Sequence, residues 1–289
     1  MTTGPSWRWE RVNPEGLKPV GGRPPLGEYL SSLWRRRHFI VADSRARVSS
    51  TGRQMFLGQA WLVLKPVLEA AVYMIIFGLV LKQNRGIENF LGYLVIGVFL
   101  FQYTTRSLTS GGTAVINGKS LIHAFSFPRA SLPIAVVIRE TISMFPVLLA
   151  MVALILVIPP GAKVSTLWFL FPLVFILQFI FNFGIAMIAA RLVAYARDVT
   201  HLLNLMARFW FYGSAVFFSY DRFIDSPTML TFIQLNPLFM VLDMSRDLLL
   251  YERLPEITSW LKLSGWAAAS FLIGLIFFWR GEETYGRDS

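Results

Sequence analysis

Long apolar stretches recur along the chain, with short polar segments between them. Four stretches contain no Asp, Glu, Lys or Arg: Phe90–Thr105, Thr141–Ala162, Val164–Ala190 and Leu263–Trp279. Two more hold only isolated charges: Trp61–Leu81 and Val199–Tyr220. Because a helix needs about 20 mainly apolar residues to cross a bilayer, this pattern predicts an all-α polytopic membrane protein with six transmembrane helices. The expected ranges are 60–82, 90–110, 134–158, 165–191, 200–220 and 260–280.

The segment before the first expected span has the pattern of a helix that lies along a membrane surface. In Leu26–Val41, apolar side chains recur on one helical face, and three consecutive arginines follow a tryptophan. Such an amphipathic helix would place Trp34 at the level of the lipid headgroups, with Arg35, Arg36 and Arg37 on the phosphates of lipids or of a cargo. The alternative is a solvated run of charge that only sets the topology.

The chain therefore divides into four parts. We expect residues 1–25, which are rich in Pro and Gly and lack an apolar core, to be a flexible cytoplasmic tail without a cleavable signal peptide. Residues 26–59 form the amphipathic interface segment, 60–280 the six-helix transmembrane domain, and 281–289 a second cytoplasmic tail.

The loop 111–133, between the second and third expected spans, is short and half apolar. Asn117-Gly118 marks a turn, and Ser120–Phe127 has the length of about two helical turns. On the cytoplasmic side it would offer a compact surface to a partner. The residues expected to make that contact are Ser120, Leu121, Ile122, Phe125, Phe127, Pro128 and Arg129.

The segment 221–259 is too long for a simple connector. Its apolar middle is broken at Asn236-Pro237, so neither half is long enough to cross the membrane. We expect a re-entrant pair of short helices, Met229–Gln234 and Leu238–Leu249, that forms an outer gate. Such a pair is permitted only where protein or a cavity surrounds the backbone.

Five residues form that expected gate: Asn236, Pro237, Phe239, Leu242 and Arg246. Asn236 suits the N-cap and Pro237 the first helical position, where its missing N–H costs nothing. Phe239 and Leu242 are expected to seal the path by packing and dewetting. Arg246 is expected to lie beside Asp243 and to meet its own copy in a second protomer.

Composition agrees with a membrane protein. Hydrophobic residues make up 55% of the 289 residues and charged residues only 15%, against about 25% charged in an average soluble domain. A soluble enzyme and a disordered chain are thereby disfavoured. The net charge of +10 indicates basic loops at an anionic membrane surface, and we expect no nucleic acid partner.

The distribution of charge sets the expected orientation. Lys and Arg gather in residues 1–59, in 106–133, in 191–208 and at the C-terminus, whereas 221–259 has six acids against three arginines. Because positive loops stay inside, both termini are expected in the cytoplasm.

The sequence offers little catalytic chemistry. The chain has no cysteine and three scattered histidines, so neither a thiol nor a metal cluster is expected. A phosphate-binding loop of the G-x-x-x-x-G-K-[ST] type is also absent from the sequence. Glu69, four residues after Lys65, is interpreted as one half of a helical ion pair. We expect no catalytic site and no cofactor in this chain.

Four stretches together resemble a known family. The first leads into the expected first span, where Leu57, Gly58, Trp61, Leu64 and Pro66 match, with Asp43, Arg45 and Arg47 as partial equivalents of a charged motif before it. The others are Gly118–Pro133, Tyr195–Val199 and Leu235–Arg246. In order and spacing over residues 28–280 they are similar to the permease subunit of type-2 ABC exporters for O-antigen, capsule, teichoic acid and galactan.

That resemblance implies a bacterial inner-membrane homodimer with two cytoplasmic ABC ATPase subunits, which would hold the ATP and Mg²⁺. It also implies that loop 111–133 couples to the ATPase and that the cargo is a lipid-linked glycan. Sugar rings stack on aromatic side chains, so an aromatic path is expected from Tyr73, Phe77, Phe209, Trp210 and Tyr212. Two alternatives stay open: the same architecture exporting a drug or a lipid, and a membrane-embedded glycosyltransferase or acyltransferase.

Overall fold

The computed structural model describes residues 23–50, 58–76, 87, 89–124, 127–159, 161–218 and 233–285. Within these ranges every regular element is a helix. The α-helices are α1 (Leu26–Arg35), α2 (Arg37–Ser50), α3 (Trp61–Tyr73), α4 (Phe90–Gly112), α5 (Ala114–Asn117), α6 (Lys119–Ala124), α7 (Ser131–Val157), α8 (Phe171–Tyr195), α9 (Val199–Gly213), α11 (Pro237–Leu249) and α12 (Ile257–Arg280). Two 3-10 helices are η1 (Gly58–Ala60) and η3 (Thr166–Leu170).

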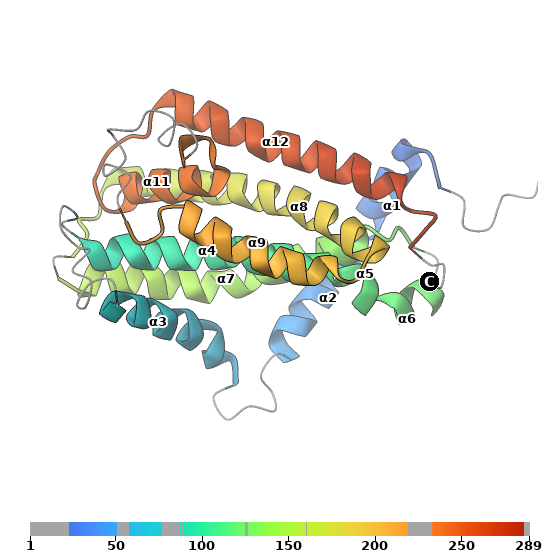
Figure 1. The fold of residues 1–289 in the computed structure, drawn as a ribbon, viewed down its shortest axis with the longest axis horizontal. Coiled ribbons are helices and arrows are strands. Elements are labelled where there is room, and N and C mark those ends of the chain that lie inside the picture. The colour runs from blue at the N-terminus through green and yellow to red at the C-terminus, as the bar shows by residue number, and fades with distance from the viewer. Residues whose placement is uncertain are drawn as a thin grey trace, which may run out of the picture.

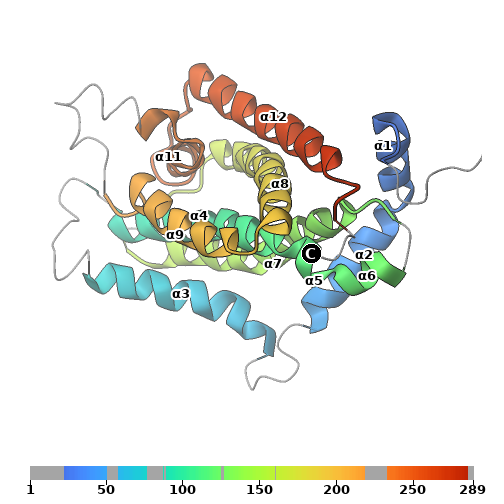
Figure 2. The ribbon, with the colours of Figure 1, turned by 45° about the vertical axis from the view of Figure 1, so that its right-hand side comes forward.

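The long helices run side by side along the longest axis of the molecule (Figure 1). Helices α3, α4, α7, α8, α9 and α12 form this bundle, with α12 and α3 at opposite sides of it. Helices α1, α2, α5 and α6 gather at one end, near the C-terminus, and α11 lies at the other (Figures 1 and 2). We call these the terminal end and the α11 end.

Three helical segments are long and apolar enough to cross a membrane: Ser131–Val157, Thr166–Tyr195 and Ile257–Arg280. They correspond to the third, fourth and sixth expected spans. Helix α4 coincides with the second expected span, whereas the described part of α3 covers only the first part of 60–82. The bundle is thus confirmed as helical, with three candidate spans among the described residues.

Helix α9 is shorter than the sequence predicts. The expected span was 200–220, but the helix ends at Gly213. At about 1.5 Å per residue, its 15 residues extend about 22 Å, less than the about 30 Å of a bilayer core. The chain turns directly afterwards, where Ala215 has a positive φ of 49°. The carbonyls of Ala215 and Val216 in this turn accept hydrogen bonds from Arg246 of α11, a contact that the local sequence does not reveal.

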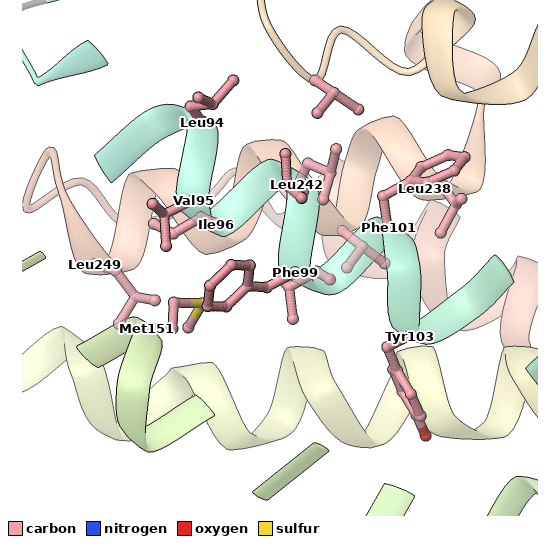
Figure 3. Packing of buried hydrophobic residues seen from close by; sticks show 14 of the residues in the cluster. Leu94, Val95, Ile96, Phe99, Phe101, Tyr103, Met151, Leu238, Leu242 and Leu249 are labelled. Atoms are coloured by element: carbon pink, nitrogen blue, oxygen red, sulfur yellow. The ribbon is translucent and has the colours of Figure 1, made fainter. Parts of the chain in front are cut away.

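The core forms around the first half of α4. That half is apolar on all sides, and a helix of this kind has to be enclosed by others. Leu94, Ile96 and Phe99 are fully buried. Figure 3 shows Phe99 beside Met151 of α7, and Leu242 of α11 on the other side of α4.

Helices α8 and α12 approach each other at two glycines. A Cβ on Gly184 would lie 2.1 Å from the carbonyl carbon of Ser270, and one on Gly274 would lie 2.3 Å from the carbonyl oxygen of Gly184. Small residues at such crossings let helix backbones meet closely inside a membrane. The fourth and sixth expected spans are therefore joined by direct backbone contact.

The prediction of one straight helix over 26–41 is wrong. The chain turns at Arg36, which has φ −92° and ψ 3°, so α1 ends at Arg35 and α2 begins at Arg37. Helix α2 then continues to Ser50 and packs against α7, where Ser44 donates a hydrogen bond of 2.9 Å to the carbonyl of Ala135. The expected apolar face is therefore divided between two helices.

Candidate functional site

A cavity of about 920 Å³ opens between α3, α4 and α9. Its volume falls in the range of about 300–1,000 Å³ that is usual for ligand sites. Several of its lining side chains are exposed, Leu205 and Tyr212 among them, so the cavity is open on one side of the chain. We call it the α3–α4–α9 cavity.

Aromatic rings line one part of the cavity: Tyr73, Phe101, Phe211 and Tyr212. The Phe211 ring lies at their centre, 5.3 Å from Tyr73, 5.0 Å from Phe101 and 5.7 Å from Tyr212 between ring centroids. Such tilted and edge-on contacts stabilise the arrangement of the rings. Helix α9 contributes two consecutive residues to this cluster, Phe211 and Tyr212.

Polar and charged side chains line the other part of the cavity: Lys65, Glu69, Gln102, Thr105, Arg106, His201, Asn204 and Arg208. Gln102 of α4 donates a hydrogen bond to the Glu69 carboxylate and accepts one of 3.5 Å from Arg106. The lining contains three cations, Lys65, Arg106 and Arg208, and one carboxylate, Glu69. This part of the cavity therefore carries net positive charge and favours anions. The sequence suggested Lys65 as the partner of Glu69, but in the structure the Glu69 carboxylate is bound by Gln102 of the neighbouring helix.

The five residues expected along the glycan path separate in the structure. Tyr73 and Tyr212 line the cavity. Trp210 is half-buried instead, with its indole N–H donating to Asn236 at 2.8 Å. Phe209 is 65% exposed and does not line the cavity. Phe77 lies outside the described residues.

Sequence reasoning missed the polar part of the cavity, although α9 contains a usable signal. His201, Asn204 and Arg208 follow each other at spacings of three and four residues, which places them on one helical face. A polar stripe on an otherwise apolar helix usually marks a face that meets water or substrate. Phe101, Phe211 and Gln102 were also missed, because the sequence alone does not reveal which faces of α4 and α9 meet.

At the α11 end, Asn236 connects the end of α9 to the beginning of α11. Its side-chain oxygen accepts from the N–H of Leu238 at 3.0 Å, which makes it the N-cap, with Pro237 as the first helical residue. Its amide nitrogen donates to the Ser214 hydroxyl at 2.9 Å. The expected helix Leu238–Leu249 is confirmed as α11, whereas most of Met229–Gln234 lies outside the described residues.

Arg246 does not reach a second protomer. It is 1% exposed, and its guanidinium donates to the carbonyls of Tyr93 at 3.2 Å, Ala215 at 3.1 Å and Val216 at 3.0 Å. It also lies 3.3 Å from the centre of the Tyr93 ring. The expectation of a contact across the two-fold axis is wrong, because these contacts enclose the side chain within one chain. They are also the reason why α9 ends early.

Phe239 and Leu242 are buried inside the bundle, and neither lines the α3–α4–α9 cavity. Leu242 belongs to the core around α4 (Figure 3). Leu242 thereby helps to hold α11 against the bundle, and the sealing of the path by Phe239 and Leu242 stays a prediction.

At the terminal end, the loop 111–133 folds into α5 and α6. Ser120 is exposed and Leu121 and Ile122 are half-buried, and Ile122 packs against the cluster that contains Tyr29. Phe127 and Pro128 follow in irregular structure, and Phe125 lies outside the described residues.

The end of this loop meets both ends of the described chain at Glu282. The Glu282 carboxylate accepts from the Tyr29 hydroxyl at 2.7 Å and from the backbone N–H of Arg129 at 2.8 Å. The N–H of Ala130 in turn donates to the Tyr29 oxygen at 3.1 Å. Burial raises the pKa of Glu282 and of the Tyr29 hydroxyl. We call this set of contacts the Glu282 node, and it connects α1, the loop and the end of α12.

The arginines of the interface segment take different positions. Arg37 lies 4.6 Å from the Trp34 ring and donates to the Trp34 carbonyl at 3.0 Å. Arg35 and Arg36 are exposed around the turn, and Trp34 is 69% exposed. None of the four lines the α3–α4–α9 cavity.

The sequence of the chain is similar to those of known membrane transporter proteins. The family model for the ABC-2 type transporter matches residues 40–250, from α2 to the end of α11. An O-antigen export system permease protein RfbA from Myxococcus xanthus is 26% identical over 260 residues, which cover 88% of this chain and 96% of that protein. Two proteins of that name from Klebsiella pneumoniae are each 28% identical, over 206 and 222 residues. These two matches cover 71% and 76% of this chain, and 76% and 83% of the relatives.

The matched region contains the three helices of the open cavity and the loop 111–133, and the sequence has no nucleotide-binding motif of its own. The chain therefore belongs to the ABC-2 type transporter family, as a membrane permease subunit whose ATPase is a separate chain.

Proposed function

We propose that this chain forms the membrane path of an ATP-driven exporter that moves a lipid-linked polysaccharide across the bacterial inner membrane. The observation that carries the proposal is the dual lining of the α3–α4–α9 cavity. Aromatic faces suit the C–H faces of sugar rings, and the basic part suits the phosphates that join a glycan to its lipid. The similarity to permeases named for O-antigen export supports the same substrate class.

A homodimer would complete the path. The cavity is open on the side where Leu205, Arg208 and Tyr212 are exposed, so a second copy facing it would enclose a continuous channel. Two ATPase subunits that bind ATP and Mg²⁺ would contact the pair at the terminal end. Both termini would then lie in the cytoplasm, in agreement with the basic residues there.

Six membrane crossings per chain are part of the proposal. Helices α3, α4 and α9 run parallel to the three candidate spans (Figure 1). Helix α9 with the turn that follows it would complete its crossing together with α11, which is enclosed by protein as a re-entrant segment has to be.

Three further roles follow for the residues at the two ends. The loop residues from Ser120 to Arg129 would contact the ATPase. Arg35 and Arg36 would meet the phosphate of the cargo lipid at the inner leaflet, with Trp34 at the level of the lipid headgroups. Helix α11, held by Asn236 and Arg246, would close the outer end of the path.

Paired alanine variants on α9 test the proposal. In a strain that depends on this chain for its surface polysaccharide, Tyr212→Ala should lower the export rate, because it removes a ring from the cavity. The matched control is Phe209→Ala, an exposed aromatic three residues away that lies outside the cavity. The measurement is surface glycan per cell, with lipid-linked glycan retained on the inner leaflet as the complementary readout.

The outcomes also separate the alternatives. Equal export by both variants contradicts the proposed path. A deletion strain with normal surface glycan but altered drug sensitivity or lipid distribution would indicate a drug or lipid exporter. A change in the chemical structure of the glycan, without its retention inside, would indicate a transferase.

A further inference from the structure

A second concave surface lies away from the α3–α4–α9 cavity, at the corner between α1 and α2. It is a groove of about 630 Å³ that these helices form with α7, α8 and α12. None of its lining residues lines the α3–α4–α9 cavity, and the two sites share no helix. We call it the corner groove.

The chemistry of the corner groove is almost uniform. Its walls are apolar side chains, among them Leu30, Ile138, Phe183 and Phe271. Arg37 is its single charged lining residue. The guanidinium is oriented by its contacts with the Trp34 ring and carbonyl, and these leave N–H groups for an anion because Arg has five donors.

The position of the groove along the helices fits one membrane leaflet. Ile138 lies near the beginning of α7, and Met187 and Leu275 lie near the ends of α8 and α12. All three places are at the terminal end of the bundle (Figure 2). A ligand in the groove would thus have its apolar part between spans and its polar part beside α1 and α2.

We propose that the corner groove binds one acyl chain of an anionic phospholipid from the inner leaflet, with the headgroup phosphate on Arg37. The apolar walls match a hydrocarbon chain, and the cation at the mouth matches a phosphate. Arg35 and Arg36 beside it add positive potential that favours anionic over zwitterionic lipids. This site goes beyond the proposed export function, because α3, α4 and α9, which form the proposed path, do not line the groove.

Native mass spectrometry of the purified full chain in detergent tests the site. The probes are palmitoyl-oleoyl phosphatidylglycerol and palmitoyl-oleoyl phosphatidylcholine, added separately at equal concentrations. We expect the phosphatidylglycerol to be retained more strongly. Arg37→Gln should weaken its retention about tenfold, since it removes a charge-assisted hydrogen bond. The matched control is Arg45→Gln, an exposed arginine of α2 that lies outside the groove, and it should stay within about twofold of wild type.

A second pair of variants tests the acyl-chain part. Ile138→Phe adds volume inside the groove and should reduce retention of both lipids. Leu149→Phe adds similar volume at a position of α7 that is 73% exposed and should leave retention unchanged. Circular dichroism and the melting temperature show whether each variant is folded. Because Arg37 is exposed, we expect Arg37→Gln to fold, so its test remains valid even if Ile138→Phe does not fold.

Three results would overturn the proposal. One is equal loss of phosphatidylglycerol by the Arg37 and Arg45 variants. Another is unchanged retention by both Arg37→Gln and a folded Ile138→Phe. The third is displacement of phosphatidylglycerol by undecaprenyl phosphate at equal concentration, which would make the groove a site for the cargo lipid. A failure of export in the Tyr212 test leaves these results unaffected.

Discussion

Among the described residues, Arg246 is the largest side chain that is fully buried. A buried cation is costly unless its hydrogen bonds are satisfied. Here the donors meet three backbone carbonyls and the face of Tyr93. Tyr93 completes the set, because its hydroxyl lies 2.7 Å from the carbonyl of Phe218 and 3.0 Å from that of Ala215, which share its single proton. The pair thus holds the chain after α9 in a turn instead of a further helical turn.

Replacing Arg246 should therefore destabilise the chain strongly. Arg246→Met removes the guanidinium donors from the carbonyls of Tyr93, Ala215 and Val216, and we expect a loss of about 1–3 kcal/mol, the usual cost of leaving a buried acceptor unsatisfied. Thermal unfolding of the purified protein in detergent measures this. Arg253→Met, at an exposed arginine of the same region, is the control and should change stability by less than about 0.5 kcal/mol. Equal melting temperatures for the two variants would contradict this role.

Glu282 gives a prediction about pH. Burial raises the pKa of Glu282 in the folded state. The folded chain therefore binds a proton at this carboxyl more tightly than the unfolded chain does, where a Glu carboxyl has a pKa of about 4.3. Its contribution to stability is therefore greatest below that pH and declines as the pH rises toward the raised folded value. Glu282→Gln should remove this part of the pH dependence, measured as the melting temperature between acidic and neutral pH. The exposed Glu283→Gln should retain the wild-type slope, and a slope shared by all three proteins would exclude Glu282 as its source.

At the scale of elements, the close crossing of α8 and α12 is the contact that depends most on residue size. A methyl group on Gly274 would collide with the backbone of α8, so no rotamer change can relieve it. The two helices would have to move apart, and their shared interface would loosen over several turns.

Gly274→Ala should accordingly destabilise the bundle by about 1–3 kcal/mol, the usual cost of overpacking. Gly265→Ala on the same helix is the matched control, since a Cβ there meets nothing within 4 Å. Loss of helicity on heating in detergent is the measurement. A stability of Gly274→Ala at or above that of Gly265→Ala would show that the crossing tolerates a methyl group.

The sequence predicted those elements whose signal is local. Ranges for α4, α7 and α12 agree with the structure within three residues at each end, because each has a long apolar run, whereas α8 begins six residues later than expected, after η3. The cap of α11 was predictable as well, since Asn-Pro has a local meaning. The early end of α9 was not, because it depends on a contact between Ala215 and Arg246, 31 residues away in sequence. The turn at Arg36 was missed as well.

The candidate site shows the same division. An aromatic run at 209–212 signalled that rings would be used, but packing decides which of them line the cavity. Tyr212 does, whereas Trp210 is held by Asn236, 26 residues away in sequence. The polar part depends on α3, α4 and α9 being neighbours, and one amphipathic face by itself does not reveal its partner.

At the scale of the whole molecule, the open side of the α3–α4–α9 cavity makes a prediction about assembly. The chain contains no native cysteine, so single introduced thiols can be read without background. Leu205→Cys, at an exposed position of the cavity, should be linked to its own copy by a short bifunctional maleimide. Leu272→Cys, exposed on α12 away from the cavity, should remain monomeric on a denaturing gel. Linkage at Leu272 alone would place the dimer on the other face.

The Glu282 node has a consequence for how the protein is made. Tyr29 and Glu282 are 253 residues apart, and at about 5–20 residues per second the ribosome needs roughly 13–50 s to deliver the second after the first. During that interval the Tyr29 hydroxyl has no Glu282 carboxylate to donate to, although Val115, Ala130 and Met187 of its apolar cluster are already part of the chain. Helix α1 thus obtains its complete set of contacts only after Glu282 has been synthesised. A nascent chain that stops before Glu282 would hold α1 by fewer contacts, a difference that cellular proteases can recognise.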